Sequence, residues 1–121
     1  MKYLVLLIFM IGSTSMFAQD RNAKASFQVD GVCMMCKDRI EKAGITSKGV
    51  KFADWNLETQ ELQLIFNENK TDLKTIQGNI LDAGHDLESL KATDEAYAKL
   101  DDCCKYRDPE VREDHVSGKI D

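Results

Sequence analysis

The chain has 121 residues, of which 16 are Lys or Arg and 21 are Asp or Glu, so its formal net charge is −5 at pH 7. This length supports one modest hydrophobic core. The negative charge argues against nucleic acid or an anionic membrane as partner and weakly favours cations. A solvated acidic surface would give the same balance of charges.

The first 18 residues have the order of a secretory signal peptide. Lys2 precedes an apolar run that extends from Tyr3 to Ile11, small residues begin at Gly12, and we expect cleavage after Ala18. The run is well short of the roughly 20 residues of a membrane-spanning helix. The alternatives are an uncleaved anchor and a lipoprotein signal, and the latter needs a cysteine at the cleavage site, where there is none. We therefore expect an exported protein, periplasmic or secreted, without stable membrane insertion.

Hydrophobic spacing predicts the elements of the mature chain. Alternation, as in Leu62, Leu64 and Phe66, indicates strands, and the spacing of Leu73, Ile76 and Ile80 indicates a helix. In chain order we expect a strand over 25–32, a helix over 36–44, two hairpin strands over 53–57 and 62–66, a helix over 71–84 and a short strand over 87–90. This is the order of the ferredoxin-like βαββαβ sandwich, in which both helices cover one face of the sheet, so the fold class is α+β.

Beyond this unit the chain continues for some 30 residues. Thr93 is a good N-cap for an extra C-terminal helix, which we place within residues 92–106. Residues 107–121 contain the single proline, Pro109, and little apolar content, so they are expected to form a flexible tail.

All four cysteines lie in the mature part of the chain, as Cys33-x-x-Cys36 and as the adjacent pair Cys103 and Cys104. Cysteines of exported proteins usually form disulfides, but adjacent cysteines bridge to each other only with strain. The first pair lies where the first strand turns into the first helix. A helix N-terminus lowers the pKa of a thiol, and thiolates bind soft ions such as Cu(I) and Zn(II).

The segments VDGVCMMCKDRIEKA and GVKFADWNLETQELQLIFNEN, with a later helix ending in AGHD, resemble the heavy-metal-associated domain of copper chaperones, periplasmic mercury-binding proteins and metal-pump tails. The resemblance covers residues 25–91. It implies that Cys33 and Cys36 ligate a soft metal ion, Cu(I) first, with Zn(II), Hg(II) or Cd(II) as alternatives. The family usually has Gly-Met-x-Cys-x-x-Cys, whereas only Val32 separates Gly31 from Cys33 here. The missing methionine leaves the metal preference open.

Three further residues are candidates for the same site. The fold brings the end of the second helix towards the cysteine loop, so His85 is predicted to ligate the metal or tune the thiolates, and a helix-capping surface histidine is the alternative. The last strand leads roughly 20 Å away from the loop, and the extra helix returns roughly 16 Å. Cys103 or Cys104 is therefore a hypothetical third or fourth ligand, and this would favour Zn(II) or several copper ions. Burial as an apolar residue, or a disulfide, is the alternative for this pair.

Two methionines and a second histidine are weaker candidates for metal ligands. Met34 and Met35 can offer thioethers to Cu(I), although one of them is expected to fill the core. His115 can bind a metal weakly with Glu113 and Asp114, but a solvated tail is the simpler interpretation.

These patterns predict a binding protein, not an enzyme, that sequesters a soft metal ion or transfers it. Its expected partners are the ion and a metal-transport protein that accepts it by ligand exchange, and the chain is expected to be a monomer or a metal-bridged dimer. The main alternative is a periplasmic thiol-disulfide oxidoreductase with Cys33 as nucleophile. The sequence favours it less, because a thioredoxin-type site resembles a different order of strands and helices and needs a cis-proline facing the cysteines. A third interpretation is an interaction module in which the cysteines form simple disulfides.

Overall fold

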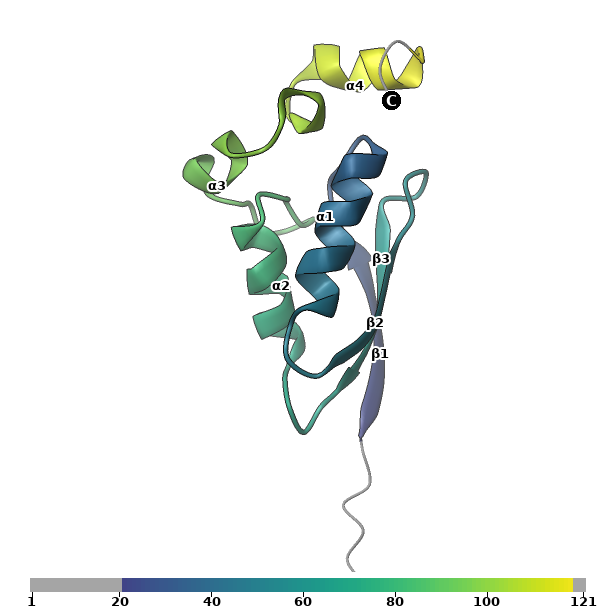
Figure 1. Ribbon diagram of the computed structural model, residues 1–121, viewed down its shortest axis with the longest axis vertical. Helices are drawn as coiled ribbons and strands as arrows, with labels where there is room; N and C mark the ends of the chain where they lie inside the picture. Colours follow the sequence, from purple (N-terminus) through teal and green to yellow (C-terminus); the bar gives the residue numbers. More distant parts are fainter. Residues whose placement is uncertain (1–20, 119–121) are drawn as a thin grey trace, which may run out of the picture.

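A three-stranded antiparallel sheet covered by two helices forms the body of the protein. The computed structural model describes residues 21–118 (Figure 1). Strands β1 (Asn22–Gln28), β2 (Val50–Trp55) and β3 (Glu61–Asn67) pair in the order β1-β3-β2. Helices α1 (Met34–Ile45) and α2 (Leu73–Asp82) lie on the same face of this sheet. The prediction of an α+β, ferredoxin-like arrangement is therefore confirmed.

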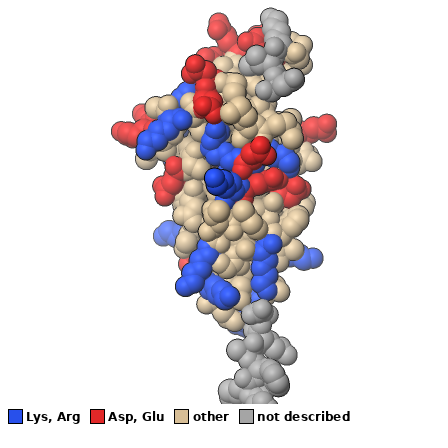
Figure 2. Space-filling view, viewed as in Figure 1, with Lys and Arg blue, Asp and Glu red and all other residues tan. Residues whose placement is uncertain are grey.

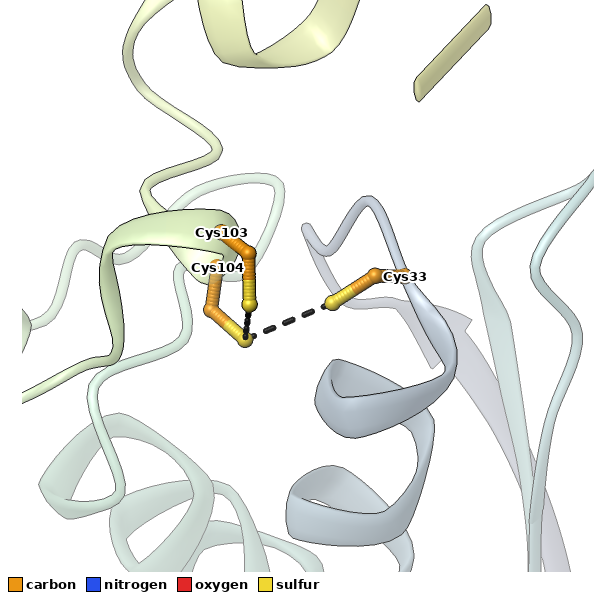
Figure 3. A group of neighbouring side chains, drawn as sticks. All are labelled: Cys33, Cys103 and Cys104. Atoms are coloured by element: carbon orange, nitrogen blue, oxygen red, sulfur yellow. Dashed lines mark hydrogen bonds between the residues drawn. The ribbon is translucent and has the colours of Figure 1, made fainter. Parts of the chain in front are cut away.

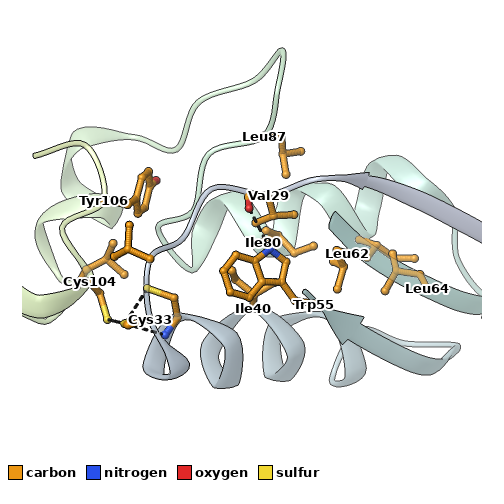
Figure 4. Packing of buried hydrophobic residues seen from close by; sticks show 14 of the residues in the cluster. Val29, Cys33, Ile40, Trp55, Leu62, Leu64, Ile80, Leu87, Cys104 and Tyr106 are labelled. Carbon is orange, nitrogen blue, oxygen red and sulfur yellow. Dashed lines mark hydrogen bonds between the residues drawn. The ribbon is translucent and has the colours of Figure 1, made fainter. Parts of the chain in front are cut away.

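The core lies between the sheet and the two helices, as the alternating sequence pattern requires. β1 and β3 pair in a register that places Phe27 opposite Leu62. Trp55 is fully buried, and its indole Nε1–H donates to the carbonyl oxygen of Val29 at 3.0 Å. Buried with it are Ile76 and Phe66 and, labelled in Figure 4, Ile40, Leu62, Leu64 and Ile80. Trp55 thus ties the end of β1 to the core just before the cysteine loop begins.

The fourth strand predicted over residues 87–90 is reduced to a single antiparallel bridge between Val29 and Leu87. The backbone N–H of Leu87 donates to the carbonyl oxygen of Leu90 at 2.8 Å, so the segment turns instead of extending along β1. The carboxylate of the preceding residue, Asp86, accepts two hydrogen bonds from the guanidinium of Arg107 in the C-terminal part of the chain. This pairing fixes the segment where the strand would have continued.

The C-terminal extension, residues 92–118, lies across the end of the body at which α1 begins (Figure 1). It contains α3 (Asp94–Ala98), a short 3-10 helix η1 (Asp102–Cys104) and α4 (Pro109–Val116). The prediction of an extra helix is confirmed, but the helix ends at Ala98, and the cysteines lie in η1. The predicted flexible tail includes α4, because the carboxylate of Asp108 caps its N-terminus and Pro109 occupies the first turn.

Among residues 21–118, no helix is both long enough and apolar enough to cross a membrane. The signal peptide predicted for residues 1–18 lies outside the described part of the chain.

Candidate metal centre

The first two cysteines are positioned by the start of α1. Cys33 is the N-cap residue, and its Sγ accepts a hydrogen bond from the backbone N–H of Cys36 at 3.4 Å. This contact turns both thiols towards the same point, and their Sγ atoms lie 3.2 Å apart. The loop is tightly packed, because a Cβ on Gly31 would lie 3.0 Å from both Cys36 Cβ and the ring of Trp55. The short loop between Gly31 and Cys33 therefore brings the helix start directly onto the core.

The extension brings the other two cysteines to this point. The Sγ of Cys104 lies 3.3 Å from the Sγ of Cys33, although 71 positions separate them in the chain. The Sγ of Cys103 lies 3.9 Å from the Sγ of Cys104. Figure 3 shows Cys103 and Cys104 side by side, with Cys104 facing Cys33. The ligand atoms of Cys33, Cys103 and Cys104 all lie within 4.8 Å of one another. Together with Cys36 we call these residues the cysteine cluster.

The spacing of the cysteine cluster suits ligation of a metal ion. Two sulfurs bound to one ion at about 2.3 Å each lie about 3.8 Å apart in tetrahedral geometry and at most about 4.6 Å apart in linear geometry. Of the Sγ separations, that of 3.9 Å falls within this range, and those of 3.2 and 3.3 Å are shorter than it by about half an ångström. Each of the four cysteines is a free thiol. Small side-chain movements would therefore let two or more thiolates bind one soft ion.

The cysteines differ in their access to solvent. Cys33 is 2% exposed, and Cys36 and Cys104 are fully buried, whereas Cys103 is half-buried. Figure 4 shows Cys33 and Cys104 at one end of the row of buried apolar side chains. Burial raises the pKa of the Cys33 thiol to about 12 and that of Cys103 to about 11, and it also raises the pKa of Cys36. In the absence of an ion these three thiols are protonated at neutral pH.

Cys104 is the exception, because a cation lies beside it. Burial alone would raise its pKa, but the Arg39 guanidinium, together with the neighbouring thiols of Cys33 and Cys36, lowers it. Arg39 projects from α1, and its Nη2 donates to the carboxylate of Asp101 at 3.2 Å. Its Nη1 is buried and has no hydrogen-bond partner within residues 21–118. Arg39 is thus placed to compensate the negative charge that a metal-thiolate centre carries.

His85 reaches this end of the molecule but is not part of the sulfur group. Its Nδ1 lies 2.7 Å from the carbonyl oxygen of Asp30, just before the cysteine loop. The residue is fully buried, so the alternative of a surface histidine is wrong. Its Nε2 is buried and has no hydrogen-bond partner within the described residues. Burial lowers the pKa of His85 to about 4, which keeps the ring neutral. Ligation by His85 stays a prediction.

Two residues after Cys104, a second set of contacts fixes the extension to the body. Arg107 binds Asp86 through two hydrogen bonds, from Nη2 at 2.7 Å and from Nε at 3.0 Å. The Tyr106 hydroxyl donates to the carbonyl oxygen of Gly84 at 2.7 Å. Sequence reasoning missed Arg39, Tyr106 and Arg107. The only available signal in the sequence was the aromatic-cation pair Tyr106 and Arg107, one residue after the two cysteines and at the start of the segment interpreted as tail.

The remaining sulfur near the cluster belongs to Met35. Its Sδ lies 3.5 Å from the Sγ of Cys103, and the side chain is 45% exposed. Met34 is 55% exposed, so neither methionine fills the core as the sequence had suggested for one of them. The Nδ1 of His115 contacts the carbonyl oxygen of Val111 within α4, and its Nε2 is buried without a hydrogen-bond partner among residues 21–118, so weak metal binding by His115 stays a prediction.

Charge is unevenly distributed over the surface. On the face seen in Figure 2, acidic side chains are most frequent around the end that carries the extension, and the opposite end shows mainly lysine and arginine. The acidic residues of the extension are Asp94, Glu95, Asp101, Asp102, Asp108, Glu110, Glu113 and Asp114. The end that holds the cysteine cluster is therefore the end with the more negative field, which favours the approach of cations.

The chain is similar to several known proteins. A copper-exporting P-type ATPase from Staphylococcus haemolyticus is 29% identical over 85 residues, which are 69% of this chain but only 11% of that protein. Among solved structures, the CopZ metallochaperone is 29% identical with a TM-score of 0.52, over 54% of this chain and 98% of that one. The N-terminal domain of a potential copper-translocating P-type ATPase from Bacillus subtilis, solved in the Cu(I)-loaded state, is 26% identical with a TM-score of 0.53, over 61% of this chain and 94% of that one.

These solved structures cover little more than half of this chain, and the extension continues beyond the matched family region. The model of the heavy-metal-associated domain matches residues 26–86, half of the chain. That span includes Cys33, Cys36 and His85 and excludes Cys103 and Cys104. The chain therefore belongs to the heavy-metal-associated domain family, and it carries a second pair of cysteines beside the family's own.

Proposed function

We propose that this protein binds a soft metal ion, Cu(I) first, at the cysteine cluster, and that it sequesters the ion or passes it on by ligand exchange. One observation carries the proposal: the Sγ atoms of Cys33 and Cys104 lie 3.3 Å apart, with Cys36 at 3.2 Å from Cys33. The buried sulfur of Cys33 therefore lies next to two others, that of Cys36 from its own loop and that of Cys104 from the extension. Sulfur ligands of this kind select Cu(I) and Zn(II) over Mg(II) and Ca(II).

Cysteines 33, 36 and 104 are assigned as the inner ligands. Metal binding displaces the thiol protons, so the ion converts a buried neutral cluster into a buried anionic one. Three thiolates and one Cu(I) carry a net charge of about −2, part of which the Arg39 guanidinium offsets. The copper-binding relatives support Cu(I), and Zn(II), Hg(II) and Cd(II) remain chemically compatible with the same sulfurs.

The role is that of a binder without catalysis. A thiol-disulfide oxidoreductase needs a reactive thiolate that its substrate can reach. Cys33 is 2% exposed and its pKa is raised to about 12, so it lacks both properties. We further propose that the protein works outside the cytoplasm, periplasmic or secreted, because residues 2–18 have the pattern of a signal peptide. A metal-transport protein would then be its exchange partner.

Anaerobic titration of the fully reduced protein with Cu(I), in competition with a chromogenic chelator, tests the proposal. We expect tight binding by the wild type and losses on the order of a hundredfold or more in both Cys33→Ser and Cys104→Ser. The surface variant Lys74→Ser serves as the matched control and should bind as the wild type does. If the wild type fails to bind Cu(I) and Zn(II) tightly while its thiols cycle with a disulfide substrate, the proposal is overturned in favour of redox chemistry.

A further inference from the structure

A fifth sulfur extends the cysteine cluster towards solvent. The Sδ of Met35 lies 3.5 Å from the Sγ of Cys103, which itself lies 3.9 Å from the Sγ of Cys104. Neighbouring sulfurs therefore follow one another from Cys36 through Cys33, Cys104 and Cys103 to Met35, and no step is longer than 3.9 Å. Because two sulfurs on one ion lie at most about 4.6 Å apart, the two sulfurs of each neighbouring pair are close enough to share one ion.

Access to solvent divides this row into two parts. Cys33, Cys36 and Cys104 are buried, with exposures of 2%, 0% and 0%. Met35 is 45% exposed and Cys103 is half-buried, so these two sulfurs can be reached from outside. A soft ion arriving from a donor cannot contact the buried sulfurs unless the extension moves aside. The ion can bind first to the sulfurs of Cys103 and Met35 without such a movement.

We propose that Cys103 and Met35 form an outer soft-metal site, through which Cu(I) reaches and leaves the inner ligands. This inference rests on the proposed function, since it assumes that the buried cysteines bind the ion. One thiolate and one neutral thioether suit Cu(I) and Ag(I) better than Zn(II), which prefers harder or more negative donors. The thioether also cannot form a disulfide, as a second exposed thiol could.

The transfer is a series of ligand exchanges without a change of oxidation state. Cu(I) binds the Cys103 sulfur, whose proton goes to solvent, and the Met35 thioether completes the pair. The Cys104 thiol then releases its proton to solvent, and its sulfur replaces the thioether on the ion. Exchange with Cys33 and Cys36 follows, their protons go to solvent, and Cys103 regains a proton when the ion leaves it. Each step needs only the neighbouring sulfur, because the separations lie between 3.2 and 3.9 Å.

The test compares Met35→Leu with Met34→Leu in the full reduced protein. Both changes conserve side-chain volume at exposed positions, so neither should unfold the chain. Ag(I) serves as a redox-inert probe of stoichiometry, and stopped-flow transfer of Cu(I) from the loaded protein to a chelator gives the exchange rate. We expect two Ag(I) ions per wild-type chain and per Met34→Leu chain, but one per Met35→Leu chain. The same variant should transfer Cu(I) more slowly, on the order of tenfold.

The outcomes separate this inference from the proposed function. Equal stoichiometry and equal transfer rates in the two methionine variants, with tight inner binding retained, would overturn the outer site and leave the inner site standing. Absence of tight binding in the wild type would overturn both. The variant Cys103→Ser provides a second test of the outer site. It should bind one Ag(I) fewer than the wild type but still bind Cu(I) tightly, whereas Cys104→Ser should lose the tight binding of Cu(I).

Discussion

The ring of Tyr106 stacks on the imidazole of His85, with centroids 5.4 Å apart and planes 18° apart. His85 in turn contacts the carbonyl oxygen of Asp30, three residues before Cys33, and Tyr106 follows Cys104 by two residues. One stacked pair thus connects the two segments that supply the sulfurs. The separation of the Cys33 and Cys104 thiols therefore depends on contacts that themselves contain no sulfur.

Removal of the Tyr106 hydroxyl is expected to loosen this connection. In Tyr106→Phe the stacking remains, but the carbonyl oxygen of Gly84 and the N–H of Asp86 lose their partner in a buried place. Buried polar groups left without partners cost roughly 2 kcal/mol in free energy of unfolding, which urea denaturation would measure. Tyr97→Phe is the control, since its hydroxyl is half-buried and accepts one bond at 3.2 Å, so its effect should be smaller. Equal stability of wild type and Tyr106→Phe would contradict this account.

Loss of Arg39 is expected to weaken metal binding more than folding. The guanidinium lowers the pKa of Cys104, so in Arg39→Gln the thiol holds its proton more strongly and the anionic centre loses a compensating charge. Affinity for Cu(I) should fall on the order of tenfold, and the loss should be larger at pH 6 than at pH 9, because protons compete with the ion. Chelator competition at both pH values measures it. Arg21→Gln, at the far end of β1, should leave affinity unchanged, and a similar loss there would point to a general charge effect.

Stability is expected to fall as the pH drops from 6.5 towards 4. Burial lowers the pKa of His85 from 6.5 to about 4. Between these values the unfolded chain binds a proton that the folded chain excludes, so the free energy of unfolding decreases with decreasing pH. The loss between pH 7 and pH 5 is roughly 2 kcal/mol. Urea denaturation at the two pH values should show this dependence in the wild type and a flatter one in His85→Asn, and an unchanged slope in the variant would exclude His85 as its source.

Gly84 is expected to tolerate no side chain. Its φ of 101° lies in the left-handed region, and a Cβ there would lie 2.8 Å from the carbonyl oxygen of Ala96 in α3. Gly84→Ala should therefore cost about 2 kcal/mol in free energy of unfolding. Gly78→Ala is the matched control, because a Cβ at that helical position meets nothing within 4 Å. It should instead stabilise the protein by roughly 0.5–1 kcal/mol. Thermal denaturation of both variants measures the contrast, and a stable Gly84→Ala would disprove close packing of α3.

Local sequence patterns predicted most of the strands and helices of the body. They failed where contacts between distant segments determine the structure. Alternation around Leu62 to Phe66 and helical spacing around Ile76 are properties of the segments themselves, so β3 and α2 were found within a few residues. The strand predicted over 87–90 was lost to a turn and to the pairing of Asp86 with Arg107, which no short segment reveals. The capping signal of Asp108 and Pro109 was present in the sequence, but the low apolar content of α4 concealed it.

The site was partly predictable for the same reason. Distances along ideal elements suggested that the second cysteine pair returns to the first, and the structure brings Cys103 and Cys104 close to Cys33, although by a bent path through α3 and η1. Arithmetic on segment lengths requires no knowledge of packing. The position of Arg39 beside Cys104 depends on how α1 faces the extension, and this is decided only by tertiary contacts.

The separation of Cys33 from Cys104 by 71 positions has a thermodynamic consequence. An ion held by both sulfurs is a reversible crosslink that closes a long loop. In the chain-entropy description of crosslinks, such a loop lowers the conformational entropy of the unfolded chain and so raises the free energy of unfolding by about 4 kcal/mol. A covalent bridge makes that restriction permanent, whereas a metal bridge lasts only while the ion is bound. Removal of the ion would therefore make it easier for residues 92–118 to detach from the body. How firmly this C-terminal part is attached would then show whether the protein holds a metal ion.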